Sequence, residues 1–336
     1  MKAIIPLAGR GTRLRPHTLT TPKPLVRVAG KPVMSYILDQ FPELGIDEVV
    51  FIVGYLREEV KEFITTEYPE LTARFVVQEV QDGTAGAIKL AEPYADEDLL
   101  IVFVDTLFDA DLTLPSRLDA EWSGIIWAKE VEDYQRFGVI VTDGEGGMTR
   151  IVEKPKEPIS KLANIGLYYI RDSALLFEGI NHVLNSEPGP SGEFYLTDAF
   201  QYMVDQGARI RTAPVGGWYD CGKVETLLET NAHLLATSRG GRSADAVVDA
   251  GSRLEEPVRL ESGVSVRAST IGPDVTLEEG VTVVESTLQN CIVGPGATVR
   301  NAHLTDSIIG ENAQVAGVRG RVNAAGYTEI EGSDQD

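Results

Sequence analysis

The hydrophobic rhythm of the chain changes once, near residue 240. Before that point, short apolar runs alternate with amphipathic stretches, which is typical of a parallel sheet covered by helices. Beyond it the helical pattern disappears and aliphatic residues recur at steps of six or five. A small, polar stretch at residues 237–243 separates the two patterns and reads as a linker. The sequence therefore predicts two different folds in one chain.

The first part is predicted to be a doubly wound, mostly parallel α/β fold of the Rossmann-like type. In such sheets ligands bind beyond the carboxyl ends of the strands, so we expect binding residues in the loops that follow strands. The expected strands cover residues 2–8, 48–53, 74–77, 99–104, 124–129 and 167–170, and the expected helices cover residues 33–41, 57–65, 84–91 and 223–236.

The second part is predicted to be a left-handed parallel β-helix. Ile271, Leu277 and Val283 follow at steps of six, and several other steps are five, so the solenoid is expected to be imperfect. A β-sandwich is the alternative, but its strands would alternate at period two. The expected domains are residues 1–238, residues 245–320 and an acidic tail at residues 321–336, of which residues 331–336 are expected to be frayed.

The net charge is −21, from 51 acidic and 30 basic side chains. Such a chain repels nucleic acid and anionic lipid at long range, so neither is an expected partner. Any polyanionic ligand must then meet a local basic pocket. Solubility, or a salty cytoplasm, is the simpler explanation of the charge.

Two cysteines, Cys221 and Cys291, are too few for a disulfide framework. The apolar run that starts the chain is too short for a signal peptide, and no stretch approaches the length of a membrane span. We expect a cytoplasmic protein.

A glycine loop with nearby cations follows the first expected strand. Its sequence is LAGRGTRLRP at residues 7–16, and TTPKPL follows at residues 20–25. Glycines after a strand let backbone amides approach phosphate oxygens, while arginine grips phosphate with two parallel hydrogen bonds and lysine supplies a compact charge. The loop residues assigned to nucleotide binding are Leu7, Gly9, Gly11 and Thr12, and the cations are Arg13 and Lys23.

This segment resembles the sugar-1-phosphate nucleotidylyltransferases, which join a nucleoside triphosphate to a sugar 1-phosphate. The usual loop of that family is one residue longer, since Arg10 here stands alone between Gly9 and Gly11. The resemblance extends over essentially the whole chain, and its motifs lie between residue 2 and about residue 236.

The segment QDGTAGAI at residues 81–88 places glycines at the start of an expected helix, a suitable wall for a flat base or a phosphate. In the resembling family this region and the glutamine before it read the nucleobase. The resemblance therefore assigns Gln78, Gly83 and Thr84 to nucleotide binding. A plain helix cap explains Gly83 and Thr84 as well.

Two aspartates are candidate magnesium ligands. Asp105 ends the strand at residues 99–104, and Asp220 lies just before an expected helix. Magnesium prefers one or two carboxylates together with phosphate oxygens and water. The resemblance maps both onto the family's metal-holding aspartates, although either alone is more often a turn or cap residue.

The sugar phosphate is expected at residues 151–155, where an anion and a cation stand side by side. Lys154 is assigned to the phosphate of the sugar, with an exposed turn as the alternative. By resemblance, the sugar-binding residues are Gly138, Glu153, Asn164, Glu193 and Trp218.

The implied reaction is synthesis of a nucleoside diphosphate sugar, with dTTP and glucose 1-phosphate as the favoured substrates. Arg13, Lys23, Asp105, Lys154 and Asp220 are the candidate catalytic residues. Mannose-1-phosphate guanylyltransferase is the nearest rival. Two other classes stay open: an acyltransferase, for which His303 is the available base in the solenoid, and a non-catalytic regulatory homologue. Self-association through a solenoid face predicts a homo-oligomer.

Overall fold

The structure is a computed structural model that describes residues 1–189 and 191–332. It divides into two compact units, described separately below. The first contains residues 1–9 and 37–218, and the second contains residues 10–36 and 219 onward. The segment of residues 10–36, which carries two of the candidate catalytic cations, therefore belongs to the same unit as the C-terminal part of the chain.

The first unit contains a mixed sheet with the strand order β10-β9-β11-β6-β1-β4-β5. Strands β6, β1, β4 and β5 are parallel, whereas β11 runs antiparallel to β6 and also pairs with β8, which in turn pairs with β12. The strands are β1 (Lys2–Pro6), β4 (Glu48–Val53), β5 (Thr72–Val77), β6 (Leu99–Val102), β8 (Gly124–Glu130), β9 (Gly138–Thr142), β10 (Met148–Glu153), β11 (Leu162–Ile170) and β12 (Ile210–Pro214). Strand β7 (Thr106–Phe108) follows β6 along the chain.

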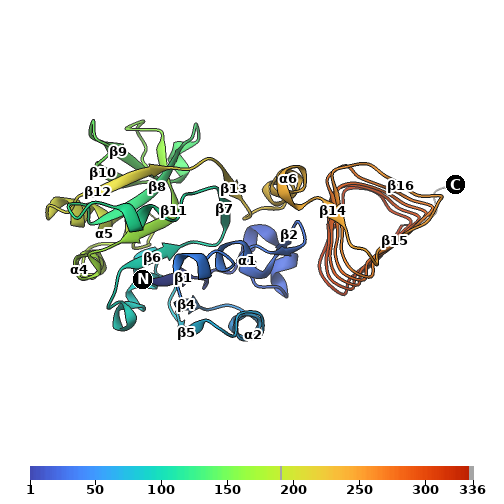
Figure 1. Cartoon of the computed structure of the whole chain (residues 1–336), viewed down its shortest axis with the longest axis horizontal. Coiled ribbons are helices and arrows are strands. Elements are labelled where there is room, and N and C mark those ends of the chain that lie inside the picture. The colour runs from blue at the N-terminus through green and yellow to red at the C-terminus, as the bar shows by residue number, and fades with distance from the viewer. Residues whose placement is uncertain (190, 333–336) are drawn as a thin grey trace. The chain divides into compact units, whose positions relative to one another are not determined.

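Helices α2 (Arg57–Glu67), α3 (Thr84–Lys89), α4 (Ser173–Leu184) and α5 (Leu196–Asp205) belong to this unit. Helices α4 and α5 lie side by side (Figure 1) and bury a shared apolar face that includes Leu176, Ile180 and Phe200. The chain starts α4 with Asp172, whose carboxylate accepts a hydrogen bond from the backbone N of Leu175 at 3.0 Å, an N-cap contact.

The six expected strands and the helices at residues 57–65, 84–91 and 223–236 are present; the strand at residues 48–53 has the expected bounds, and the other elements have shifted ends. The expected helix at residues 33–41 is reduced to one short turn, α1 (Ser35–Leu38). Helices α4 and α5 were not expected from the sequence. No element was assigned to the positions of these two helices.

The second unit combines residues 10–36, helix α6 (Val224–Leu234) and a stack of short strands. Residues 10–36 form three turns of 3-10 helix and the small hairpin of β2 (Arg27–Val28) and β3 (Lys31–Pro32). Strand β13 (Trp218–Asp220) leads into α6. The stacked strands are β14 (Gly241–Arg242), β15 (Val247–Val248), β16 (Arg253–Leu254), β17 (Val258–Leu260), β18 (Ser265–Arg267), β19 (Thr270–Ile271), β20 (Val275–Leu277), β21 (Thr282–Val284), β22 (Thr287–Val293), β23 (Thr298–Arg300), β24 (His303–Ile309), β25 (Gln314–Ala316), β26 (Arg319–Gly320), β27 (Asn323–Ala324) and β28 (Glu329–Glu331).

These strands pair in parallel from one coil to the next, as a β-helix requires. Val266 pairs with Val283, Val283 with Val299 and Val299 with Val315, and all four side chains are buried in the solenoid core. Figure 1 shows the coils stacked as a triangular prism. The parallel pairing excludes the β-sandwich alternative for this segment, because the ladders of a sandwich are antiparallel.

The ends of the solenoid differ from the expectation. The expected linker at residues 237–243 contains β14, which pairs with β17 and so begins the first coil. At the other end, β27 and β28 lie inside the segment at residues 321–336, which was expected to be an acidic tail beyond the β-helix. Residues 333–336 lie outside the described residues. Within the described ranges no helix is both long and apolar enough to span a bilayer.

Candidate active site

The glycine loop brings Lys23 against the backbone of Gly11. Gly11 has φ 59°, a left-handed conformation that favours glycine, and a methyl group there would lie 3.0 Å from Cβ of Lys23 and 3.1 Å from Cγ2 of Thr18. The Thr18 hydroxyl donates a hydrogen bond to the carbonyl oxygen of Gly11 at 2.8 Å. Thr12 and Arg13 follow in a turn of 3-10 helix (Thr12–Leu14) and are exposed.

Three of the candidate catalytic side chains converge at Gly222. A methyl group on Gly222 would lie 2.8 Å from Oδ1 of Asp220, 3.1 Å from Nη2 of Arg13 and 3.6 Å from Nζ of Lys23. The backbone N of Gly222 also donates to Oδ1 of Asp220 at 2.7 Å. Glycine at this buried position therefore leaves room for two cations and a carboxylate to meet. We call Arg13, Lys23, Asp220 and Gly222 the phosphate cluster.

A second group of predicted residues converges at Gly138, in the first unit. A methyl group there would lie 2.7 Å from Cγ2 of Thr197 and 2.8 Å from Oε2 of Glu153, and it would clash with the amide of Asn164. The Asn164 amide donates to the carbonyl oxygen of Gly138 at 2.9 Å, and the Thr197 hydroxyl donates to Oε2 of Glu153 at 3.2 Å. We call Gly138, Glu153, Lys154, Asn164 and Thr197 the sugar cluster.

The carboxyl group of Glu153 is held in a mostly dry position. Its side chain is 17% exposed, and burial raises the pKa of the carboxyl, while the ammonium of Lys154, 3.8 Å away, and the Thr197 hydroxyl oppose that shift. A partly desolvated carboxylate of this kind makes strong hydrogen bonds with hydroxyl donors.

Lys154 has φ 45°, an unusual conformation for a residue with a side chain. Its backbone N donates to the carbonyl oxygen of Phe137 at 3.0 Å, and its Nζ lies 4.9 Å from the centre of the Tyr195 ring. Backbone strain in a non-glycine residue is often found at functional positions.

Asp105 is half-buried at the turn after β6. Burial raises the pKa of the nearby Tyr168, and the negative charges of Glu153 and Asp105 raise it further. The hydroxyl of Tyr168 donates to the side-chain oxygen of Asn164, a member of the sugar cluster.

The loop between β5 and α3 is closed by backbone contacts with the segment before α5. The backbone N of Phe194 donates to Asp82 O at 2.8 Å, and the backbone N of Ala85 donates to Phe194 O at 3.0 Å. Gly83 has φ 121°, and a side chain there would collide with the backbone of Phe194. The amide of Gln78, which is buried, donates to Oδ1 of Asp82 at 3.3 Å.

Two further side chains of this loop, those of Thr84 and Gln81, form hydrogen bonds with other segments. Thr84 Oγ1 accepts from the backbone N of Leu196 at 2.8 Å, and the exposed Gln81 donates to the carbonyl oxygen of Ala8 at 2.8 Å. Leu7 is buried, and its backbone N donates to Ile52 O at 2.7 Å. A methyl group on Gly9 would meet nothing within 4 Å, so Gly9 lies beside open space.

The two remaining predicted residues lie at the edges of the first unit. Trp218 stacks edge-on against Phe137, with ring centroids 4.9 Å apart. Glu193 is exposed and accepts a hydrogen bond from Ser191 at 3.4 Å.

Sequence reasoning did not assign a role to Thr197, Tyr168, Gln81 or Gly222. Their partners are far away in the chain, so no local pattern marks them. Cys221 is buried, as is Cys291. Among the described residues no group of three or more His, Cys, Asp or Glu side chains is arranged to hold a metal ion.

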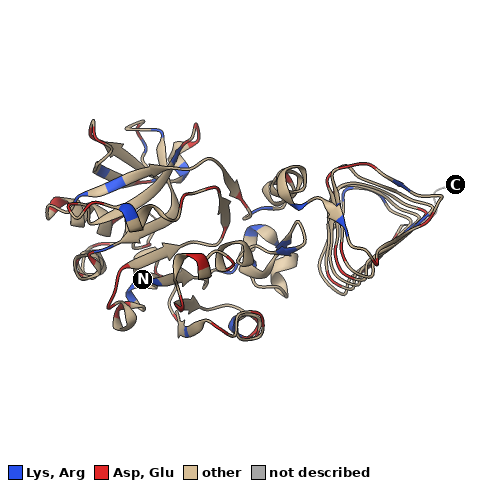
Figure 2. Ribbon diagram, viewed as in Figure 1, with Lys and Arg blue, Asp and Glu red and all other residues tan. Residues whose placement is uncertain are grey.

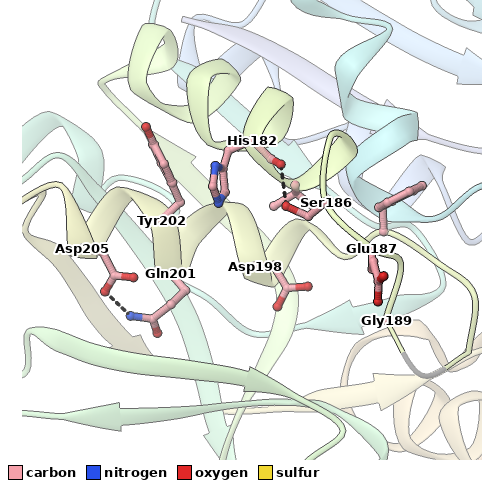
Figure 3. A pocket seen from close by; sticks show the side chains of 10 residues that line it. His182, Ser186, Glu187, Gly189, Asp198, Gln201, Tyr202 and Asp205 are labelled. Atoms are coloured by element: carbon pink, nitrogen blue, oxygen red, sulfur yellow. Dashed lines mark hydrogen bonds between the residues drawn. The ribbon is translucent and has the colours of Figure 1, made fainter.

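A cavity of about 260 Å³ lies apart from all the predicted site residues. Figure 3 shows it between the end of α4, with His182 and Ser186, and the exposed side of α5, with Asp198, Gln201 and Asp205. Gln201 accepts a hydrogen bond from the backbone N of Ile151 at 2.8 Å, so its amide braces β10 from this side.

The environment of Glu153 predicts a change in stability. Because burial raises the pKa of Glu153 above its usual value of 4.5, the folded chain holds this proton more tightly than the unfolded chain, and stability falls as pH rises through the raised pKa. We therefore expect Glu153→Gln to be more stable than the natural chain at pH 7, with the gain shrinking as the pH approaches 4.5.

Urea unfolding at both pH values measures this difference. The matched control is Glu157→Gln, at an exposed position nearby, which should leave the free energy of unfolding unchanged. A loss of stability in Glu153→Gln at pH 7 would contradict the interpretation.

Figure 2 shows acidic and basic residues spread along both units. Arg13 and Lys23 meet locally at Gly222.

Comparison with known proteins assigns the family. Residues 2–237 match the nucleotidyl transferase family. The low-salt glycan biosynthesis nucleotidyltransferase Agl11 of Haloferax volcanii is 34% identical, and the alignment covers 94% of each chain. A glucose-1-phosphate thymidylyltransferase of Streptomyces antibioticus is 30% identical over 94% of this chain and 93% of that protein. The bifunctional protein GlmU of Methanocaldococcus jannaschii is 31% identical over 81% of this chain but only 61% of its own length.

A solved structure gives the same result. The crystal structure of a UDP-glucose pyrophosphorylase complexed with UDP-glucose superposes with a TM-score of 0.62 and 25% identity, covering 70% of this chain and 98% of that one. The family match spans the motifs at Gly11, Gly83 and Gly222, and the chain therefore belongs to the nucleotidyl transferase family.

Proposed function

We propose that the chain transfers a nucleotidyl group from a nucleoside triphosphate to a sugar 1-phosphate, releasing pyrophosphate, and that its substrates are dTTP and glucose 1-phosphate. The observation that carries the proposal is the phosphate cluster. In a chain of net charge −21, Arg13 and Lys23 meet at one buried glycine beside a carboxylate, which is what a polyphosphate bound with a divalent cation needs.

The two clusters suit the two substrates. Arg13 and Lys23 are assigned to the triphosphate, with the loop residues Gly9, Gly11 and Thr12 providing backbone amides. The base is assigned to Gln78 and Gly83, whose amide groups match the edge of a pyrimidine. The loop of Gln78 and Gly83 is fixed by Phe194 and Ala8, which supports a rigid base-reading wall.

The sugar 1-phosphate is assigned to the sugar cluster. Lys154 binds its phosphate, and the half-dry carboxylate of Glu153 accepts hydrogen bonds from sugar hydroxyls. Asn164 is oriented by its bonds to Gly138 and Tyr168, so its amide is preorganised. Glu193 and Trp218 are assigned to the rim of this pocket.

The reaction needs no protein nucleophile. A phosphate oxygen of the sugar 1-phosphate forms a bond to the α-phosphorus of the triphosphate, while the bond from that phosphorus to the pyrophosphate oxygen breaks on the opposite side. The two anionic reactants repel each other, so the chain accelerates the step by holding them in line and by neutralising charge with Arg13, Lys23 and Lys154.

Asp105 and Asp220 are proposed to hold a magnesium ion. The donor set fits, because magnesium uses one or two carboxylates and takes its other ligands from phosphate and water, so a cluster of three protein ligands is not needed. Both aspartates are half-buried; Asp105 lies in the turn after β6, and Asp220 is the last residue of β13. When bound, the ion supplies positive charge and Lewis acidity at the phosphates.

The choice of dTTP is supported by likeness over nearly the whole chain to the thymidylyltransferase of Streptomyces antibioticus, including the solenoid. GTP with mannose 1-phosphate is the alternative pair, and UTP is another, since a UDP-glucose pyrophosphorylase shares the fold of the first two thirds. A cytoplasmic location, where both substrates are made, and a homo-oligomer formed through the solenoid complete the proposal.

Pyrophosphate release across a grid of dTTP, UTP and GTP against glucose, mannose and N-acetylglucosamine 1-phosphates tests the function. We expect the highest kcat/KM for dTTP with glucose 1-phosphate. A different best pair would correct the substrates alone. No release with any pair, while magnesium nucleotide still binds, would favour a non-catalytic homologue.

Asp105→Asn is expected to fold normally and to lose most turnover, because one of the two magnesium-binding carboxylates is removed. The matched control is Asp109→Asn, an exposed aspartate just beyond the same turn, which should retain turnover. Initial rates across a magnesium titration measure the effect. Full activity of Asp105→Asn at saturating magnesium would refute the metal role.

Gly222→Ala is expected to lower kcat/KM by about a hundredfold, because the new methyl group displaces Arg13 and Asp220 from their meeting point. The control is Gly216→Ala, where the methyl group makes only ordinary contacts at 3.6 and 3.7 Å. Steady-state kinetics and circular dichroism of both variants separate displacement from misfolding. An active Gly222→Ala enzyme would contradict the assignment.

A further inference from the structure

The segment of residues 10–36 is bound to the solenoid by buried polar contacts that the reaction itself does not use. It carries Arg13 and Lys23, and it shares a compact unit with the β-helix. Within the segment, these contacts are made by His17 and by residues 27–30. Each joins residues that are more than two hundred positions apart.

The strongest of these contacts is an ion pair to a fully buried carboxylate. Glu278, in the solenoid, has a side chain that is 0% exposed, and its Oε2 accepts from Nε of Arg27 at 2.9 Å. The Nη2 of Arg27 donates to the carbonyl oxygen of Gly30 at 2.7 Å. Arg27 is thus held between the solenoid and the turn of its own hairpin.

The other oxygen of Glu278, Oε1, has no hydrogen-bond partner among the described residues. A buried carboxylate with one unmatched oxygen is costly, and apolar side chains of similar size would serve folding as well or better. Stability of the solenoid alone therefore does not explain a glutamate here. Its direct effect is to fix the position of Arg27.

A second buried contact reinforces the first. Asn231, on α6, is completely buried, and its side-chain oxygen accepts from the backbone N of Ala29 at 3.0 Å and from the Thr276 hydroxyl at 2.7 Å. Its amide donates to the carbonyl oxygen of Asp274 at 3.2 Å. One side chain thus joins the hairpin of residues 27–32 to helix α6 and to the solenoid.

The beginning of the segment is also attached. His17 is buried, and its Nε2 forms a hydrogen bond with the side-chain oxygen of Asn323. At Gly30, a methyl group would collide with Arg259 and Glu261 of the solenoid, so the hairpin turn lies directly against it. Lys23 lies between these two attachment points in the chain.

We propose that Glu278 is a positioning residue for nucleotidyl transfer: through Arg27 it lets the β-helix hold the segment of residues 10–36 so that Arg13 and Lys23 meet at Gly222. The proposal rests on the proposed function in one respect, that these two cations act on the triphosphate. It assigns the solenoid a part in catalysis without any reacting group of its own.

The test is Glu278→Gln, with the adjacent and exposed Glu279→Gln as the matched control. We expect the KM for the triphosphate to rise about tenfold or more in Glu278→Gln, because its cationic site is displaced. The KM for the sugar 1-phosphate should stay within about twofold, since the sugar cluster belongs to the other unit. Glu279→Gln should match the natural chain in both.

Loss of folded enzyme alone would lower kcat and leave both KM values unchanged, and that result would overturn the proposal. An equal rise in both KM values would also overturn it. If Glu278→Gln does not fold, the double variant Arg27→Met and Glu278→Met removes both buried charges. A folded double variant with a raised triphosphate KM supports positioning, and one with the natural KM overturns it.

Hydrogen exchange measured by mass spectrometry separates this inference from the proposed function. Peptides covering residues 10–30 should exchange faster in Glu278→Gln than in Glu279→Gln, whether or not the substrates have been identified. Unchanged exchange would overturn the tether, whereas a natural chain that releases no pyrophosphate would overturn only the proposed reaction.

Discussion

Two cations that lie close together repel each other, and a chain with a large negative charge must still keep them in place to bind a polyphosphate. Here Arg13 and Lys23 are brought to one point by a glycine that leaves space and by a carboxylate that offsets their charge. Gly222 is buried, so water and salt screen the charges that meet there less than they would on an open surface. The sequence around Gly11 and Gly222 is constrained by this requirement.

In the sugar cluster the group that the fold holds in place is a carboxylate rather than a pair of cations. Glu153 is kept mostly dry beside Lys154, and Asn164 is oriented by Gly138 and Tyr168, so the polar groups are arranged before any ligand arrives. Such preorganisation costs stability when the site is empty and lowers the reorganisation needed on binding.

Much of this could be predicted from the sequence, where the information is local. The strand at residues 48–53 has the expected bounds, and the five- and six-residue steps near Ile271 correspond to parallel coils. The glycine motif at residues 81–88 includes Gly83, where a side chain would collide with the backbone of Phe194. Helices α4 and α5 were missed, because no element was assigned between residues 170 and 223. Contacts such as Thr197 with Glu153 or Arg27 with Glu278 join distant residues that share no periodic pattern, so sequence reasoning had no signal for them.

The attachment of residues 10–36 to the solenoid has a consequence for synthesis of the chain. Arg27 and Glu278 are 251 positions apart, and His17 and Asn323 are 306 apart. A ribosome makes the early segment long before its partners, so the nascent chain must keep it unpaired until the final coils emerge. Contacts of such high sequence separation form slowly and leave polar groups and apolar surface open meanwhile. Pairing of residues 10–36 with the solenoid is therefore expected to be a late step of folding.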